Sequence, residues 1–187
     1  MRRRKQVLGD VEWSGRWARH VNEAVRQHDV KSREGLMALY DDVFDEVHRS
    51  ATRLTRGDRA AAEDLVQDAF VQLVRAARNG SVDEVGIGWL LTAVRRRHID
   101  RLRSAERENR RLRLVASSPS PQHSDGCSEI ASALGGLSIR ECTALVLRYV
   151  EDLPVAEVAE LMHSSVRATE SLLQRAKRRA RQGEVTS

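Results

Sequence analysis

Apolar residues recur at helical spacing over long stretches of this 187-residue chain, and only three prolines interrupt the pattern. No stretch shows the sustained alternation of apolar and polar residues that a half-buried strand requires. An aromatic content of 4% and a charged content of 32% also suit compact helical modules better than a β-sandwich. The sequence therefore predicts an all-α fold.

The segment from Ser117 to Gly126 interrupts the helical pattern. It is rich in serine and proline and carries almost nothing that a core could bury. We therefore expect two small helical domains joined by a flexible linker. The expected parts are an N-terminal extension over 1–32, a first domain over 33–115, the linker over 116–129 and a second domain over 130–187.

The N-terminal extension carries an amphipathic pattern of its own. Trp13, Trp17 and Val21 fall on one face of a helix. Two interpretations stay open for it: a helix that packs on the neighbouring domain, or an arm that binds a partner.

Two helices are expected between Gly35 and Arg78, separated by a turn at 55–58. Asn79 and Gly80 suit a left-handed cap that closes the second helix. The first helix carries an apolar stripe of Leu36, Leu39, Tyr40, Val43, Phe44 and Val47. The second buries a face of Leu65, Val66, Ala69, Phe70, Leu73 and Val74, while Glu63, Asp64, Gln67 and Asp68 point elsewhere.

A third helix is expected from about Ile87 to about Arg113, and it concentrates positive charge. From Trp89 through Arg113 nine arginines face three acidic residues, a local net charge of 9 − 3 = +6 that exceeds the +5 of the whole chain. Such a run is either a solvated basic face or a phosphate-binding surface. We favour phosphate contact, because this concentration of charge would repel itself without an anionic partner. Leu91, Val94, Ile99 and Leu102 can face a core, and Arg96, Arg97, Arg101 and Arg103 project away from it.

The second domain begins with a predicted capping box, in which Ser138 is the N-cap and Glu141 the third helical residue. The inward face of that helix is expected to hold Leu145, Val146, Tyr149 and Val150. Pro154 then suits the first turn of the next helix.

A helix-turn-helix follows. Ala159 is small enough for two helices to cross closely, and His163 occupies the turn residue that usually has a positive φ. Histidine replaces glycine there at a cost of about 1 kcal/mol. Ser165 can cap the final helix, whose later part is basic.

The sequence offers no catalytic or metal-binding pattern. Six histidines are scattered without metal spacing, and neither a nucleophile elbow nor a phosphate loop occurs. We therefore expect no enzyme activity, no cofactor and no metal. Cys127 and Cys142 are interpreted as free thiols, no signal peptide or membrane helix is evident, and the expected location is cytoplasmic.

Three segments resemble the extracytoplasmic-function (ECF) sigma factors, a group of RNA polymerase subunits in the sigma-70 family. Residues 62–70 (AEDLVQDAF) resemble the helix that docks on the polymerase clamp. Residues 89–103 (WLLTAVRRRHIDRLR) resemble the helix that reads and melts the minus-10 element. LVLRYV at 145–150, followed by AEVA at 156–159, resembles the domain that reads the minus-35 element.

The resemblance implies a sigma factor that binds core RNA polymerase, recognises promoter DNA and opens it, with an anti-sigma factor as a candidate further partner. Asp64, Gln67 and Asp68 would contact the clamp helices of the largest polymerase subunit. The minus-10 residues would be Trp89, Arg95, Arg96, Arg97, Arg101 and Arg103. The minus-35 residues would be Ser165, Arg167, Glu170, Ser171, Gln174, Arg175 and Arg178.

The chain departs from the family pattern at a few of these positions. Arg96 stands where asparagine is common, and Glu170 and Leu172 stand where the recognition helix usually carries basic residues. The alternative function is a helix-turn-helix regulator that binds duplex DNA alone. Such a regulator would need neither the acidic docking patch nor the separate arginine-rich helix.

Overall fold

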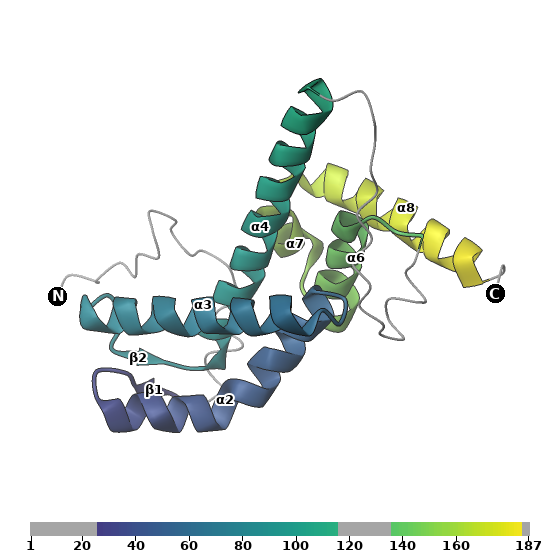
Figure 1. Cartoon of the computed structure of the whole chain (residues 1–187). Coiled ribbons are helices and arrows are strands. Elements are labelled where there is room, and N and C mark those ends of the chain that lie inside the picture. The colour runs from purple at the N-terminus through teal and green to yellow at the C-terminus, as the bar shows by residue number, and fades with distance from the viewer. Residues whose placement is uncertain (1–25, 116–135, 185–187) are drawn as a thin grey trace. The chain divides into compact units, whose positions relative to one another are not determined.

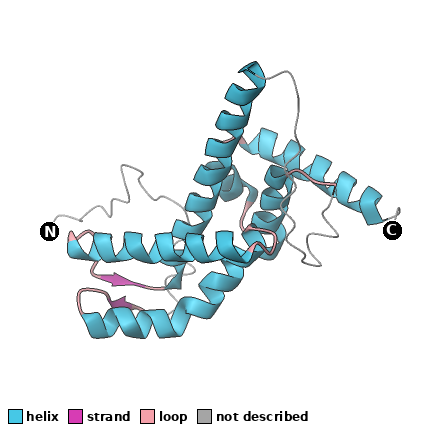
Figure 2. Cartoon of the chain, in the orientation of Figure 1, coloured by secondary structure: helices cyan, strands magenta, loops and turns pink. Residues whose placement is uncertain are grey.

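The structure is a computed structural model that describes residues 26–115 and 136–184 (Figure 1). Helices dominate it, and a single pair of two-residue strands is the only other regular element in these ranges (Figure 2), so the predicted all-α fold is confirmed. The helix expected around Trp13 and Trp17 and the linker expected over 116–129 lie outside the described residues. The elements are β1 (His28–Asp29), α2 (Arg33–Leu54), α3 (Arg59–Arg78), β2 (Glu84–Val85), α4 (Ile87–Val115), α6 (Ile139–Leu145), the π-helix η1 (Val146–Val150), α7 (Val155–Leu161) and α8 (Val166–Glu184).

The contacts between residues group the chain into two compact units. The first unit takes in Glu63–Val94 and the described residues up to Ala51. The second takes in Thr52–Ala62 and the described residues from Arg95 onward. The helices α2, α3 and α4 therefore each contribute one part to the first unit and the other to the second.

The first unit packs the apolar faces of α2, α3 and the start of α4. Leu39, Val47, Leu65 and Leu73 are almost fully buried, as their spacing predicted. One assignment to a buried face was wrong, because Val74 is 38% exposed, and Tyr40 of the predicted apolar stripe is 40% exposed. The buried face of α3 is narrower than the stripe of apolar residues in its sequence. The Tyr40 ring of α2 lies on the surface against two other aromatic rings. Its centroid is 4.8 Å from that of Phe44 and 5.1 Å from that of Phe70.

A two-stranded antiparallel sheet was not expected from the sequence: β1 precedes α2, and β2 lies between α3 and α4. His28 pairs with Val85 and Asp29 with Glu84, and two residues per strand are too few to show an alternating pattern. The buried His28 contacts Asp42 of α2 at 3.1 Å (Nε2 to Oδ2). Gly35 lies so close that a Cβ there would meet the Asp29 carbonyl oxygen at 1.7 Å, so the approach of β1 to α2 requires glycine.

Residues with positive φ angles follow α2 and α3 and terminate both helices. Gly80, at φ 66°, closes α3 as the predicted left-handed cap, and the Ser81 amide donates to the Ala76 carbonyl over 2.9 Å. At the end of α2, Arg56 (φ 59°) and Gly57 (φ 87°) turn the chain, and the Gly57 amide donates to the Thr52 carbonyl.

The second unit contains the predicted helix-turn-helix. Ser138 and Glu141 form both hydrogen bonds of the capping box at the start of α6. Ala159 is buried, His163 takes a positive φ of 48°, and the Ser165 hydroxyl accepts a hydrogen bond from the Ala168 amide at 3.2 Å. The local rules of helix capping and turn geometry therefore predicted this part correctly.

The π-helix η1 corrects the predicted inward face of the first helix in this unit. Tyr149 and Val150 were expected inside but are 50% and 53% exposed, whereas Val146 and Leu147 are buried. A π-helix has more residues per turn than an α-helix. It therefore rotates the last two residues away from the face that an α-helical period assigns to them.

Candidate functional site

The exposed face of α3 brings the three predicted docking residues together. Asp64 and Gln67 are exposed and Asp68 is half-exposed, at the spacing that places them on one side of a helix. Val71 and Val74 continue the same stripe and are 48% and 38% exposed. Sequence analysis did not name Val71 and assigned Val74 to the buried face, although their spacing from Asp64 and Gln67 could have revealed both.

The basic residues of α4 do not share one environment. Arg97 is exposed and Arg101 and Arg103 are half-exposed, as expected of side chains that project from the core. Arg96 is half-exposed as well, but its partial burial lowers its pKa, with Glu160 and Asp100 acting in the opposite direction. Trp89 is half-exposed, and within the described ranges its buried indole nitrogen makes no hydrogen bond.

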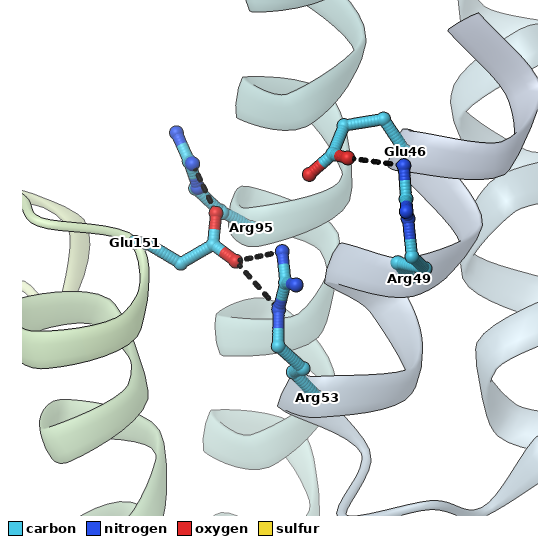
Figure 3. A network of polar contacts seen from close by, with 5 residues as sticks. All are labelled: Glu46, Arg49, Arg53, Arg95 and Glu151. Atoms are coloured by element: carbon cyan, nitrogen blue, oxygen red, sulfur yellow. Dashed lines mark hydrogen bonds and ion pairs between the residues drawn. The ribbon is translucent and has the colours of Figure 1, made fainter.

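Arg95, predicted to contact DNA, is buried against Glu151. Its side chain is 3% exposed and its Nη2 donates to Glu151 Oε2 (Figure 3). The other carboxylate oxygen of Glu151 accepts from Arg53, at 3.1 Å from Nη2 and 3.3 Å from Nε. The side chain of Glu151 is only 4% exposed, so two guanidinium groups enclose one carboxylate.

The protonation states in this network follow from burial and charge. Burial alone would raise the pKa of Glu151, but the hydrogen bonds and charges of Arg95 and Arg53 outweigh it, so the pKa lies below its ordinary value. Burial lowers the pKa of Arg95, and Glu151 opposes that shift. An arginine stays charged at any physiological pH. The contact is therefore an ion pair at neutral pH.

Two more polar contacts follow along α4 within the second unit. His98 Nε2 lies 3.0 Å from Thr143 Oγ1 in a buried pair, and Arg140 Nη1 donates to Glu106 Oε2 at 3.2 Å. The spacing of 95, 98 and 106 places these contacts near one side of α4. Their partners all lie in 140–151.

All seven predicted minus-35 residues are exposed on α8 or at its N-cap: Ser165, Arg167, Glu170, Ser171, Gln174, Arg175 and Arg178. Gln174 and Arg178 also line an open hollow of about 500 Å³ together with Lys177, Arg181 and Gln182. Within the described residues, no ion pair joins Glu170 to Arg167, although their spacing would allow one. The structure therefore presents Glu170 to solvent beside basic and amide side chains.

Glu141 holds α8 against α6. Besides capping α6, its carboxylate accepts from Arg179 Nη1 at 3.2 and 3.1 Å, one distance to each oxygen. Burial would raise the pKa of Glu141, but the hydrogen bonds from Ser138 and the charge of Arg179 lower it overall. One carboxylate thus links α6 to the helix that carries the minus-35 candidates.

Two absences hold for the part of the chain that the structure describes. No helix there is both long and apolar enough to cross a membrane. No group of three or more histidine, cysteine or acidic side chains is arranged to hold a metal ion there.

Two protein-family models match the chain. The model of Sigma-70 region 2 matches residues 39–108, which include the α3 stripe and most of α4. The model of Sigma-70 region 4 matches residues 127–179, which include α6, α7 and most of α8. Both models describe sigma factors, the subunits that direct RNA polymerase to promoters.

Curated relatives narrow the class to one family. The chain is 30% identical over 160 residues to the ECF RNA polymerase sigma factor SigK of Mycobacterium sp. (strain KMS), covering 79% of this chain and 81% of that protein. It is 28% identical over 163 residues to SigK of Mycolicibacterium vanbaalenii, covering 81% and 82%. The sigma factor RpoE of Bartonella quintana, solved with the anti-sigma factor NepR, shares the fold at a TM-score of 0.51 and 21% identity over 77% of this chain and 92% of that one.

The chain belongs to the ECF RNA polymerase sigma factors. It binds core RNA polymerase and promoter DNA and directs promoter-specific transcription initiation. Sigma factors are non-catalytic initiation factors. The alternative of a stand-alone helix-turn-helix regulator is not favoured, because region 2 accompanies region 4 in the same chain.

The buried His98 predicts a pH dependence of stability. Burial, aided by the charge of Arg101, lowers its pKa from 6.5 to about 4. Because the folded pKa lies below the unfolded one, the unfolded chain binds more protons between these values, and stability falls as the pH falls through this window. The loss reaches about 1.4 kcal/mol per pH unit, or roughly 3 kcal/mol in total.

Denaturant unfolding of the wild type and of His98→Gln over a pH series measures this contribution. The wild type should lose stability more steeply than the variant between neutral pH and about 4, while the carboxylates contribute equally to both. Parallel pH profiles for the two proteins would contradict the assignment.

Proposed function

We propose that three exposed surfaces divide the work of initiation: α3 docks on core polymerase, α4 contacts and opens the minus-10 element, and the N-terminal part of α8 reads the minus-35 element. The observation that carries this proposal is the exposure of these surfaces on three separate helices. We also propose that the chain acts in the cytoplasm, has no enzyme activity of its own, and divides into functional domains over 33–115 and 130–187.

The α3 surface suits a protein partner. It joins an acidic, hydrogen-bonding group (Asp64, Gln67 and Asp68) to two exposed valines, Val71 and Val74. Interfaces commonly combine an apolar centre with a polar rim that sets orientation and specificity. Exposed apolar side chains that continue a charged stripe therefore support docking on polymerase over simple solvation.

Asp64→Ala combined with Gln67→Ala should weaken binding to core polymerase by about thirtyfold or more, the loss expected for truncating interface hot spots. Val71→Ser should weaken it as well, with little change in melting temperature, because Val71 is 48% exposed. Asp45→Ala, an exposed acidic residue on α2, is the matched control. Unchanged affinity of the α3 variants in competition for core would refute the docking surface.

The exposed arginines of α4 suit nucleic acid. Arg97 and Arg101 lie one helical turn apart and are accessible, so both can reach phosphates of one strand. Promoter opening needs no catalytic group. Binding of unpaired bases and their backbone favours the open form, since only that form presents them.

Arg97→Gln combined with Arg101→Gln should lower permanganate reactivity around the start site, with a smaller effect on core affinity. Loss of two contacts to single-stranded DNA should also reduce the slope of log affinity against log salt by about 1.4. Arg33→Gln combined with Arg78→Gln removes the same charge from exposed positions on α2 and α3 and should leave opening unchanged. If the double variant opened promoters normally but failed to bind core, α4 would be a protein interface.

The α8 surface suits discrimination among bases. A carboxylate repels phosphate but accepts a hydrogen bond from cytosine N4, glutamine pairs with adenine, and arginine pairs with guanine. Glu170, Gln174 and Arg175 offer these three groups within two helical turns. In the competing interpretation, Glu170 simply pairs with Arg167, but the described residues contain no such ion pair.

Glu170→Lys in the holoenzyme should raise binding to non-cognate duplexes and erase the preference at one base pair of the minus-35 element. The lost discrimination should be about 1–3 kcal/mol, the value of one good base contact. Binding to a set of duplexes with each base pair varied measures it. A uniform gain in affinity for all duplexes, with the preferred base unchanged, would show that Glu170 acts only as a surface charge.

An anti-sigma factor is the further partner that we propose. RpoE of Bartonella quintana, which shares this fold, was solved with the anti-sigma factor NepR. In the second unit, Ile139, Tyr149 and Val150 are 48%, 50% and 53% exposed, and such apolar side chains favour a protein partner.

A further inference from the structure

An apolar patch lies on the surface of the first unit, where an aromatic ring of α2 meets one of α3. Met37, Tyr40 and Phe44 recur at the spacing of one helix face, and Met37 is 54% exposed. The Tyr40 ring packs against that of Phe70, and Val74 lies one turn further along α3. These five side chains form what we call the α2–α3 patch. Contiguous exposed apolar side chains are typical of a surface that another segment or protein covers.

Acidic side chains border this patch on α2. The helix carries five acidic residues against three arginines, a net charge of 3 − 5 = −2, in a chain whose net charge is +5. Glu34 and Asp41 are exposed, and neither takes part in an ion pair within the described residues. Their spacing from Met37 and Phe44 places them beside the apolar stripe. The patch therefore fits a partner that combines apolar and basic side chains.

The first 25 residues of the chain carry the complementary pattern. They contain six basic residues against three acidic ones, a net charge of 6 − 3 = +3. Trp13, Trp17 and Val21 recur at the spacing of one helix face, and Arg16 falls beside them. Tryptophan is among the residues that contribute most to the centre of an interface. This segment therefore offers both the apolar and the basic groups that the α2–α3 patch calls for.

The described chain begins close to α2. The Gln27 side chain lies against Gly86, where a Cβ would meet its Nε2 at 3.0 Å, and His28 Nε2 contacts Asp42 Oδ2 of α2 at 3.1 Å. The seven-residue step from Val21 to His28 spans about 23 Å when it is extended. A helix with its side chains is only about 10–12 Å wide. The segment that ends at Val21 can therefore cross α2 and reach the patch.

We propose that residues 13–25, here called the arm, pack on the α2–α3 patch of their own chain, with the two tryptophans on the apolar side chains and the basic groups at the acidic edge. Val74 belongs both to this patch and to the proposed docking surface of α3, so the arm and core polymerase compete for it. This competition rests on the proposed docking role of α3. Core polymerase must then displace the arm before it can bind.

Tryptophan fluorescence of the full-length protein, without polymerase, tests the packing. The chain has three tryptophans, so in Trp89→Phe all of the tryptophan emission comes from Trp13 and Trp17. Acrylamide, an uncharged quencher, should quench this emission much less in the folded protein than in the same chain unfolded by urea. A melting curve checks that Trp89→Phe folds. If it does not, subtracting the emission of Trp13→Phe combined with Trp17→Phe from that of the wild type gives the same quantity.

Two substitutions in or beside the patch identify where the arm packs. Met37→Ser removes an apolar contact and Asp41→Lys reverses a charge at the edge, and each should raise the quenching constant towards that of the unfolded chain. Val166→Ser, at a 46% exposed valine of α8, and Glu108→Lys, at an exposed residue of α4, are the matched controls and should leave it unchanged. Quenching that neither patch variant changes would overturn the packing. Shielding that grows with protein concentration would assign the patch to a second copy and overturn the intramolecular contact.

Competition with polymerase is measured separately. Trp13→Ala combined with Trp17→Ala should tighten binding to core, by about tenfold if the docked arm outnumbers the free arm ten to one. Val7→Ala combined with Leu8→Ala truncates two apolar residues before the arm and should leave the affinity unchanged. Equal affinity of the tryptophan variant and the wild type would overturn the competition. The fluorescence assay contains no polymerase, so the packing stands or fails independently of the α3 docking surface.

Discussion

The second unit depends on the burial of one negative charge. A carboxylate with a side chain only 4% exposed is tolerated only if cations and donors replace its hydration, and Arg53 and Arg95 supply them to Glu151. This requirement couples the end of α2, the middle of α4 and the residue after η1. Glu141 meets the same requirement through Ser138 and Arg179, and it thereby links α6 to α8.

The features that the sequence predicted are those determined by local rules. Helical spacing predicted α2, α3 and α4, and side-chain capping predicted Ser138 and Ser165, because the interacting groups lie within four residues of one another. The positive φ of His163 was predicted for the same reason. The exposed placement of the docking stripe and of the α8 residues followed from helical geometry alone.

Two of the features that the sequence did not predict depend on residues distant in the chain, and a third is a local change of helical period. Arg95 belongs to the same basic run as Arg97, and only the approach of Glu151, 56 residues away, distinguishes the two. The short β1–β2 pair joins strands whose two residues each cannot show a period. The π-helix changes the period inside an apolar run, and so Tyr149 and Val150 were assigned to the wrong side.

The histidine at the helix-turn-helix corner has a consequence for folding. A residue with a Cβ has fewer conformations in the unfolded chain than glycine, so ordering His163 costs less backbone entropy, which offsets part of the strain at φ 48°. The contacts that join α6, α7 and α8 also span short sequence distances, and such local topologies form quickly. These local contacts suit the helix-turn-helix to fold early, before the distant ion pairs of Glu151 can form.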